Sequence, residues 1–326
     1  AFLSATGIPA VGTYEAAGVV GRKLLDQFLG RVGLSAEEPG DVALREADVV
    51  VTIGYDLIEY APSMWLTGAT VIHVDRLPSE VDAVYRPAAE LVGEIGRSIE
   101  RLQEAVGEKR WTLTQDERKA KASITREHDL AFYKNKGGIH PARVVVELRS
   151  ALKDDDLLIS DVGAHQIWLA REFYSFQPRS LLFSMGFQTM GVSLPWAMAA
   201  RLVDRKRRIV SCSGDGSFLM SAMELETAVR RKLPIVHLVW RDGTYNLVEI
   251  QQMAAYGRAH GTKFGNPDIV KLAESFGATG LRVTKPAEIA STLSRAFKVK
   301  GPVVIDVPVD YRHNMGLLGK GRLFAD

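Results

Sequence analysis

The stretch from Ile209 to Asn246 limits the possible folds of this 326-residue chain more than any other. It opens with an apolar run that Gly214-Asp215-Gly216 interrupts, continues with apolar residues at helical spacing, and ends with a second apolar run over Ile235–Trp240. Uninterrupted apolar runs are typical of strands in a parallel sheet that is covered on both faces. The stretch therefore predicts a strand–helix–strand unit whose two strands are parallel.

An acid follows each strand of this unit. Asp215 comes directly after the first strand, and Asp242 follows the second strand 27 residues later. Because parallel strands end at the same edge of a sheet, both carboxylates are expected at that edge. Two oxygen ligands beside glycines and a helix start suit a divalent cation such as Mg²⁺ that carries a phosphate ester.

The residues of the Gly-Asp-Gly turn, taken by themselves, leave two interpretations open. One is the metal–phosphate site, and the other is a structural turn in which the glycines supply backbone freedom and the aspartate caps a helix. A dinucleotide-binding motif fits poorly, because Leu219 stands where a third glycine is required. The Walker A pattern is absent from the sequence.

The rest of the chain predicts two doubly wound parallel α/β domains that are joined by a helical linker. Residues 1–106 are expected to form a middle domain that is truncated at its start, with strands at Ile8–Gly12, Ala47–Gly54 and Thr70–Asp75 and a helix over Glu90–Val106. Residues 107–138 are charged and weakly periodic, which predicts a linker with a polar helix over Thr114–Tyr133.

Residues 139–310 are expected to form the second domain, and residues 311–326 are expected to form a loosely held tail. Expected strands, beyond the two already named, are Leu157–Ser160, Ser180–Ser184, Gly280–Val283 and Pro302–Pro308. Expected helices are Pro141–Leu152, Ala164–Tyr174, Met190–Val203, Asp268–Phe276 and Pro286–Phe297. His128 and His140 lie in or near the linker without ligand-spaced partners, so solvated or capping roles are expected for them.

Composition excludes several classes of protein. The formal net charge of +2 gives no reason to expect a nucleic acid or a membrane surface as partner, and no apolar run reaches the ~18–20 residues that span a bilayer. The single cysteine, Cys212, rules out an internal disulfide and fits a reducing cytoplasm. The first residues contain neither an initiator methionine nor a signal peptide, so the chain is expected to be the carboxyl-terminal part of a longer protein.

The Gly-Asp-Gly motif and the oxygen ligand 27 residues later resemble the motif of thiamine diphosphate-dependent enzymes, usually written GDG, about 26 residues, then Asn. Further stretches in both domains resemble one branch of that family, the catabolic acetolactate synthases. These stretches are Arg31–Leu34, Ile53–Asp56 with Glu59-Tyr60 and Met64-Trp65, Gln188–Val192 with Leu194–Ala197, Met223–Arg230 and Pro308–Arg312.

The resemblance implies a role for particular residues. It places Mg²⁺ on the side chains of Asp215 and Asp242 and on the backbone carbonyl of Thr244. The family usually has Asn where this chain has Asp242; a carboxylate is at least as good an oxygen ligand, and Asn246 is the alternative. Contacts to the thiamine diphosphate are implied for Gly163, Ala164, His165, Gln166, Gln188, Met190, Gly214, Gly216, Ser217 and Asn246.

Two of these residues are implied in catalysis. In the family, an apolar side chain at the position of Met190 wedges between the two rings of the cofactor and enforces its bent form. Backbone groups of Gln188 and Met190 would pair with the pyrimidine edge. Residue type alone also allows a simpler interpretation for Met190 and His165. A methionine between small residues is most often part of a core, and a histidine at the start of a helix can be a plain surface residue.

The resemblance also implies the reaction. Pyruvate is decarboxylated, and the remaining two-carbon unit joins a second pyruvate to give 2-acetolactate and CO₂. In the branch that prefers 2-ketobutyrate as acceptor, a tryptophan follows the metal loop, whereas this chain has Glu249-Ile250-Gln251 there. This difference favours pyruvate as the second substrate.

The family activates its cofactor with a glutamate on a pyrimidine-binding domain of a neighbouring subunit, and no stretch of these 326 residues resembles that domain. The chain by itself is therefore expected to be inactive, and the whole enzyme to be a homodimer or homotetramer. Two alternatives remain open at this stage. They are an anabolic, flavin-containing acetohydroxyacid synthase and a non-catalytic nucleotide-binding α/β protein in which both aspartates are helix caps.

Overall fold

The computed structural model describes residues 1–34, 38–119, 121, 138–265 and 267–316. They fall into two compact units: unit 1 holds the described residues of 1–14 and 20–121, and unit 2 holds 15–19 together with those of 138–316. Every paired strand in both units runs parallel to its neighbour, as the apolar runs predict. Most of the predicted helix over Thr114–Tyr133, including His128, lies outside the described residues.

Unit 1 contains two separate parallel sheets. Strands β1 (Ala10–Gly12) and β2 (Phe28–Arg31) form one, and β3 (Val49–Ile53), β4 (Thr70–Asp75) and β5 (Ala89–Val92) form the other. The helices are α1 (Phe2–Thr6), α2 (Pro39–Glu46) and α3 (Ile95–Val106), with 3₁₀ turns η1 (Arg22–Gln27) and η2 (Pro62–Met64). Buried aromatic and branched side chains pack between these elements, namely Val32, Val50, Tyr60, Trp65, Val71 and Tyr85.

One prediction for unit 1 was wrong. The expected helix over Glu90–Val106 begins only at Ile95, because Ala89–Val92 pairs with β4 as strand β5. Gly93, with φ of 155°, separates the two elements, and the carboxylate of Glu94 accepts a hydrogen bond of 2.8 Å from the Arg97 N–H at the start of α3. Leu91 lies in strand β5 but fits the helical spacing of the apolar residues in α3, so the pattern placed the start of the helix too early.

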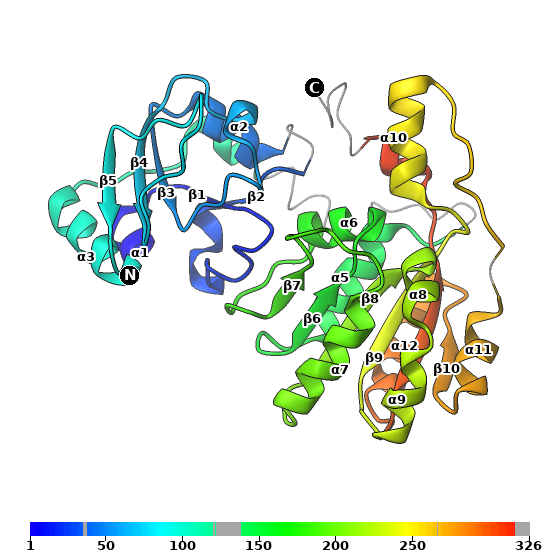
Figure 1. Cartoon of the computed structure of the whole chain (residues 1–326). Coiled ribbons are helices and arrows are strands. Elements are labelled where there is room, and N and C mark those ends of the chain that lie inside the picture. The colour runs from blue at the N-terminus through cyan, green and yellow to red at the C-terminus, as the bar shows by residue number, and fades with distance from the viewer. Residues whose placement is uncertain (35–37, 120, 122–137, 266, 317–326) are drawn as a thin grey trace. The chain divides into compact units, whose positions relative to one another are not determined.

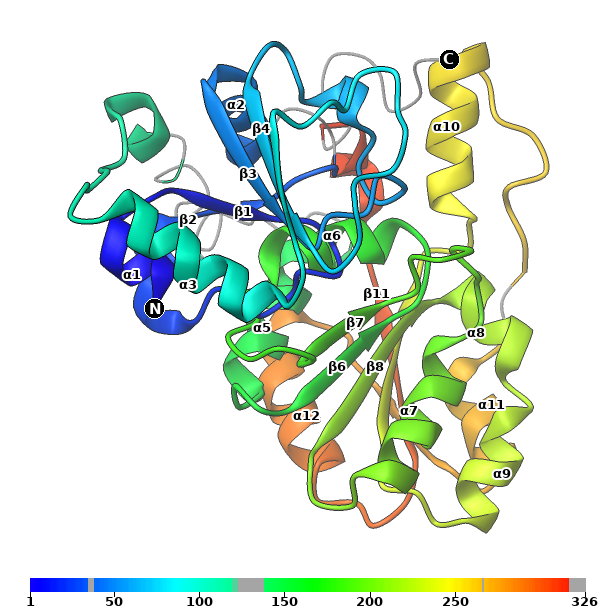
Figure 2. The same ribbon diagram turned by 60° about the vertical axis from the view of Figure 1, so that its left-hand side comes forward.

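Unit 2 is built on one six-stranded parallel sheet, in the order β10-β11-β9-β8-β6-β7. Figures 1 and 2 show helices α7, α8, α9 and α11 over one face and α5, α6 and α12 over the other, which is the doubly wound arrangement predicted for this unit. The strands are β6 (Leu157–Ser160), β7 (Leu181–Phe183), β8 (Ile209–Gly214), β9 (Val236–Arg241), β10 (Thr279–Arg282) and β11 (Val303–Pro308).

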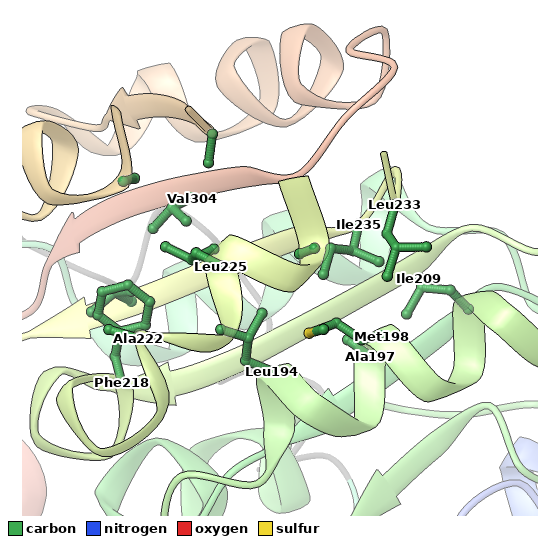
Figure 3. Packing of buried hydrophobic residues seen from close by; sticks show 14 of the residues in the cluster. Leu194, Ala197, Met198, Ile209, Phe218, Ala222, Leu225, Leu233, Ile235 and Val304 are labelled. Atoms are coloured by element: carbon green, nitrogen blue, oxygen red, sulfur yellow. The ribbon is translucent and has the colours of Figure 1, made fainter. Parts of the chain in front are cut away.

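The helices of unit 2 bury apolar side chains against the sheet. They are α5 (Pro141–Ala151), α6 (Ala164–Glu172), α7 (Ser193–Val203), α8 (Asp215–Ser221), α9 (Glu224–Arg230), α10 (Asn246–Tyr256), α11 (Ile269–Ser275) and α12 (Ile289–Ala296), with 3₁₀ turns η3 (Pro286–Glu288) and η4 (Tyr311–Gly316). Figure 3 shows the core on one face, where Leu194, Phe218 and Leu225 pack over Ile209, Ile235 and Val304. His140 caps α5, since its Nδ1 accepts from the Ala142 N–H at 3.2 Å.

Three expectations for unit 2 need correction. The single helix expected after the Gly-Asp-Gly turn is two helices, α8 and α9, with Ala222 and Met223 between them. The helix expected from Met190 begins at Ser193, because residues 190–192 form a turn that Asp161 holds. The tail is not loose at its start, since residues Tyr311–Gly316 form η4 and the side chains of Tyr311 and Asn314 are buried.

The strand order determines where a ligand can enter unit 2. After β6 the chain crosses to β7 at the sheet edge, whereas after β8 it crosses to β9 on the other side. The connections thus diverge between the carboxyl ends of β6 and β8, and such a switch point opens a crevice in doubly wound sheets. Within the described residues, no helix is long and apolar enough to cross a membrane.

Candidate functional site

A pocket opens at the carboxyl edge of the sheet in unit 2, where the strand order predicts a crevice. It encloses about 570 Å³, including the part open to solvent, which is the size of a small-molecule site. Segments that follow strands β6, β7, β8, β9 and β11 line it. The lining residues are Val162, Gly163, Ala164, His165, Met190, Gly214, Asp215, Gly216, Ser217, Trp240, Asp242, Thr244, Tyr245, Asn246, Leu247, Val248, Gln251 and Tyr311.

The two aspartates meet at this edge, as their positions after adjacent strands predict. Asp215 is the first residue of α8, and its Oδ2 accepts hydrogen bonds from the N–H groups of Asp242 at 3.1 Å and Gly243 at 2.7 Å. The carboxylate of Asp242 accepts from the Thr244 N–H at 3.2 Å. The turn after β9 is thereby tied to the turn after β8, and both acids face the same pocket.

The electrostatics of the pair favour a bound cation. Burial, together with the neighbouring carboxylates of Asp215 and Glu249, raises the pKa of Asp242 to about 7. Two carboxylates in one buried site repel each other unless a proton or a cation lies between them. Among the described residues, no three His, Cys, Asp or Glu side chains lie close enough together to hold a metal ion, so further ligands of a cation there would come from backbone or from a bound molecule.

Asn246, the alternative metal ligand, is engaged on both sides of its amide. Its Nδ2 donates to Asp242 Oδ2 at 3.1 Å, and its Oδ1 accepts from Asn314 Nδ2 at 2.7 Å. Asn314 in turn accepts from Trp168 Nε1 at 2.7 Å. This chain of hydrogen bonds orients the Asp242 carboxylate and leaves the amide oxygen of Asn246 turned toward Asn314.

The segment after β6 brings three of its four predicted residues to the pocket. Gly163, Ala164 and His165 line it, whereas the Nε2 of Gln166 donates to the Met185 sulfur at 3.4 Å outside the lining. Gly163 has φ of 149°, and a Cβ on it would lie 3.1 Å from the His165 ring, so only glycine fits. Burial lowers the pKa of His165 to about 4, and its Nε2 has no hydrogen-bond partner among the described residues.

The glycines and the serine of the Gly-Asp-Gly turn also reach the pocket. A Cβ on Gly216 would lie 2.5 Å from Cε1 of the Tyr245 ring, so this glycine permits the tyrosine to pack against the turn. The Gly216 N–H donates to Asp215 Oδ1 at 3.0 Å, and the Ser217 hydroxyl donates to the Val162 carbonyl at 3.2 Å. The second bond links the turn after β8 to the segment after β6, across the switch point.

Met190 lines the pocket, and Gln188 does not. Gln188 is exposed, with φ of 47°, in the loop that precedes Met190. Asp161, at the end of β6, holds this loop because its Oδ1 accepts from the Gly191 N–H at 2.9 Å and its Oδ2 from the Ser193 N–H at 2.8 Å. A buried carboxylate that the sequence did not single out thus holds the loop that brings Met190 to the pocket lining.

Comparisons with known proteins agree with this geometry. Residues 161–307 match the family model described as "Thiamine pyrophosphate enzyme, C-terminal TPP binding domain". Residues 1–102 match the model described as "Thiamine pyrophosphate enzyme, central domain". The chain belongs to the thiamine pyrophosphate enzyme family. The matched TPP-binding domain contains each residue that lines the pocket except Tyr311.

Three curated relatives place the chain within this family. It is 47% identical over 318 residues to "Acetolactate synthase" of Bacillus subtilis and 43% identical over 309 residues to "Acetolactate synthase, catabolic" of Raoultella terrigena. The alignments cover 95% and 93% of this chain. Identity to "Acetolactate synthase isozyme 2 large subunit" of Escherichia coli is 26% over 319 residues, or 96% of the chain. The chain is an acetolactate synthase homologue and spans 55% to 57% of these relatives' length.

The pocket has the donor set that the cofactor of this family requires. Two carboxylates at one edge suit a magnesium ion, while backbone N–H groups, a serine and a histidine on both sides of the switch point suit a diphosphate. The apolar part of the lining, from Met190 to Leu247 and Val248, suits the organic rings. The residues present therefore fit thiamine diphosphate.

Sequence reasoning missed Tyr311, Asn314 and Asp161. Tyr311 and Asp161 each follow a predicted strand within three residues, so the strand-end rule that found Asp215 and Asp242 would also have found them. Asn314 left no such signal, because its contacts are to residues 68 and 146 positions away.

Proposed function

We propose that this chain is part of a catabolic-type acetolactate synthase that depends on thiamine diphosphate and Mg²⁺. The reaction is decarboxylation of pyruvate and joining of the product to a second pyruvate, which gives 2-acetolactate and CO₂. The observation that carries the proposal is the pair of Asp215 and Asp242, which share one pocket edge with the diphosphate-type donors of the switch point. The identities of 47% and 43% to acetolactate synthases support the choice of reaction.

The magnesium ligands in this proposal are the carboxylates of Asp215 and Asp242 and the carbonyl of Thr244. Asp242 is preferred to Asn246 because the amide oxygen of Asn246 already accepts from Asn314. The diphosphate is held by Gly214, Gly216 and Ser217 on one side and by the segment Gly163–Gln166 on the other. Gln166 contributes through its backbone, since its side chain is bonded to Met185.

Thiamine diphosphate, when bound, supplies the electron sink that the decarboxylation needs. The chain's own residues bind and orient it. Met190 contributes an apolar side chain to the pocket lining, and the loop of Gln188 would supply backbone groups for the pyrimidine edge. The neutral His165 ring donates or accepts hydrogen bonds without adding charge beside the diphosphate, since burial disfavours its protonated form.

Two features favour the catabolic type over the anabolic, flavin-containing alternative. The relative named as catabolic is 43% identical to this chain, whereas the isozyme 2 large subunit is 26% identical. The stretch Glu249-Ile250-Gln251, of which Gln251 lines the pocket, stands where the 2-ketobutyrate-preferring branch is expected to carry a tryptophan, so we propose pyruvate as the acceptor. A flavin in the purified protein would absorb in the visible range, and such absorbance would count against this choice.

We propose further that residues 1–326 alone bind the cofactor but form no acetolactate, because the activating glutamate comes from another part of the enzyme. A homodimer or homotetramer would bring that acid to the pocket. Acetolactate formation by the purified 326-residue chain, detected by a colorimetric assay after acid decarboxylation, would contradict this part of the proposal.

Calorimetric titration with thiamine diphosphate in the presence of Mg²⁺ tests the cofactor assignment. Wild type is expected to bind, and Asp215→Ala to lose at least about a hundredfold in affinity, because a buried charged ligand is removed. Asp155→Ala is the matched control, since this aspartate of unit 2 is exposed and lies outside the pocket. Absence of binding by wild type, or equal binding by Asp215→Ala, would favour the non-catalytic α/β protein instead.

A further inference from the structure

The chain beyond β11 continues along the carboxyl edge of the sheet. The Val309 N–H donates to the Arg241 carbonyl at 3.1 Å, and the Asp310 N–H donates to the Ile139 carbonyl at 2.9 Å. These bonds extend the sheet pairing past the end of β11 and beside the turn that holds Asp242. They bring the next residue, Tyr311, into the lining of the pocket.

The hydroxyl of Tyr311 is buried and has no acceptor. The residue is 8% exposed, and its Oη has no hydrogen-bond partner among the described residues. A buried polar group without a partner loses its hydrogen bonds to water without replacement, so such groups in folded proteins call for an explanation. Burial, together with the charges of Asp242 and Asp215, holds the pKa of this phenol well above its ordinary value, so the hydroxyl keeps its proton.

The segment that carries Tyr311 is fixed on its other side. Asn314, in the same 3₁₀ turn η4, accepts from Trp168 Nε1 and donates to Asn246, which in turn donates to Asp242. All three distances lie between 2.7 and 3.1 Å. The position of the tyrosine is thus coupled to the same carboxylate that is proposed as a metal ligand.

We propose that the Tyr311 hydroxyl is a ligand-binding group that donates a hydrogen bond to an oxygen of the metal-bound diphosphate. This inference rests on the proposed function, since it concerns the same pocket. A protonated phenol at the edge shared by two acids requires an acceptor that arrives with the ligand, and diphosphate oxygens are strong acceptors. The turn η4 therefore forms part of the cofactor site.

The test is Tyr311→Phe, which removes only the hydroxyl. Affinity for thiamine diphosphate with Mg²⁺, measured by calorimetry, is expected to fall about tenfold to a hundredfold, as for a hydrogen bond to a charged group. The midpoint of thermal unfolding without cofactor is expected to stay the same or rise by up to about 4 °C, because an unpartnered buried group is removed. Weaker binding together with undiminished stability is the signature of a group that serves the ligand.

Tyr60→Phe is the matched control. Tyr60 is also buried, but it lies in unit 1 outside the pocket, and its hydroxyl donates to Asp41 Oδ1 at 2.6 Å. This change is expected to lower the unfolding midpoint and leave the affinity unaltered. If wild type binds the cofactor and Tyr311→Phe binds it within twofold as tightly, the inference about Tyr311 is wrong while the proposed function stands. If wild type does not bind, both are overturned.

Discussion

The two units of this chain use the same buried residue types for different purposes. In unit 1, Asp41 accepts hydrogen bonds from the Tyr60 hydroxyl and from the N–H groups of Gly33 and Glu38. Burial raises the pKa of Asp41, and these hydrogen bonds and the cation Arg45 act in the opposite direction. In unit 2, the charges that act on Asp242 are the acids Asp215 and Glu249. Both carboxylates accept hydrogen bonds from protein groups, but the pair in unit 2 also carries a like-charge repulsion that a cation would relieve.

The tyrosines repeat this difference. The Tyr60 hydroxyl is paired with Asp41, whereas the Tyr311 hydroxyl has no partner among the residues that the structure describes. A polar group whose partners are all in the protein contributes to stability. We infer that a buried hydroxyl without a partner on a residue of the pocket lining contributes to binding, because a ligand can complete its hydrogen bonds.

Replacing the satisfied carboxylate should have the largest effect on stability. Asp41→Ala leaves the Tyr60 hydroxyl and two backbone N–H groups without their acceptor, so the free energy of unfolding of unit 1 should fall by about 3 kcal/mol. Urea unfolding followed by near-ultraviolet circular dichroism, which reports the aromatic cluster around Trp65, measures this loss. Affinity for thiamine diphosphate should not change. A parallel loss of affinity would mean that Asp41 serves cofactor binding as well as the stability of unit 1.

Asp161 contributes both to stability and to the shape of the pocket. Its carboxylate is satisfied by the N–H groups of Val162, Gly191 and Ser193, yet it holds the loop that presents Met190 to the pocket. Asp161→Ala should lower the free energy of unfolding of unit 2 by about 2–3 kcal/mol and weaken cofactor binding about tenfold. Binding equal to that of wild type in a folded variant would mean that the loop does not depend on this carboxylate.

His237 is a buried side chain of unit 2 whose hydrogen bonds are made within the protein and whose charge depends on pH. Its ring lies between the hydroxyls of Ser211 and Ser213, at 2.8 and 2.9 Å, and burial lowers its pKa to about 4 from an unfolded value near 6.5. The folded protein therefore binds fewer protons than the unfolded chain between these values. The contribution of His237 to the free energy of unfolding is therefore complete above pH 6.5 and is lost as the pH falls toward 4. At pH 5 the loss is about 2 kcal/mol.

The variant His237→Gln removes this contribution. Between pH 7.5 and pH 5, the free energy of unfolding should fall about 2 kcal/mol less in the variant than in wild type, measured by urea titration at each pH. Subtracting the two curves isolates His237 from His165, whose pKa burial also lowers. Identical slopes would show that His237 is already protonated in the folded state or is not buried.

The smallest effect is expected where the family itself varies. Asp242→Asn keeps an oxygen ligand and restores the residue usual in thiamine diphosphate enzymes, so cofactor affinity should stay within about fivefold of wild type. Removing one of two like charges should raise the free energy of unfolding of the metal-free protein by about 1 kcal/mol at pH 8. A loss of affinity as large as that expected for Asp215→Ala would mean that the site needs two carboxylates.

The periodicity of apolar residues was enough to predict most of the fold. Thr70–Asp75 and Leu157–Ser160 are strands with the predicted ends, because a buried strand needs only a short apolar run bounded by polar residues. The prediction failed at Glu90–Val92, where helical spacing continued through a strand, and at Ala222–Met223, where no glycine or proline marked the break between α8 and α9. The division of the chain at residues 106 and 138 stays a prediction.

The sequence alone determined that Asp215 and Asp242 would lie at one edge of the sheet. Two strands joined by a helix are parallel, so the residues that follow them lie at the same edge. The sequence did not determine which other strand ends lie beside them. The order β11-β9-β8-β6 decides that. It places Tyr311 in the pocket lining and Asp161 where its carboxylate holds the loop that carries Met190. Strand order depends on how helices pack over the whole sheet, so the partners of the two aspartates could be read only from the tertiary structure.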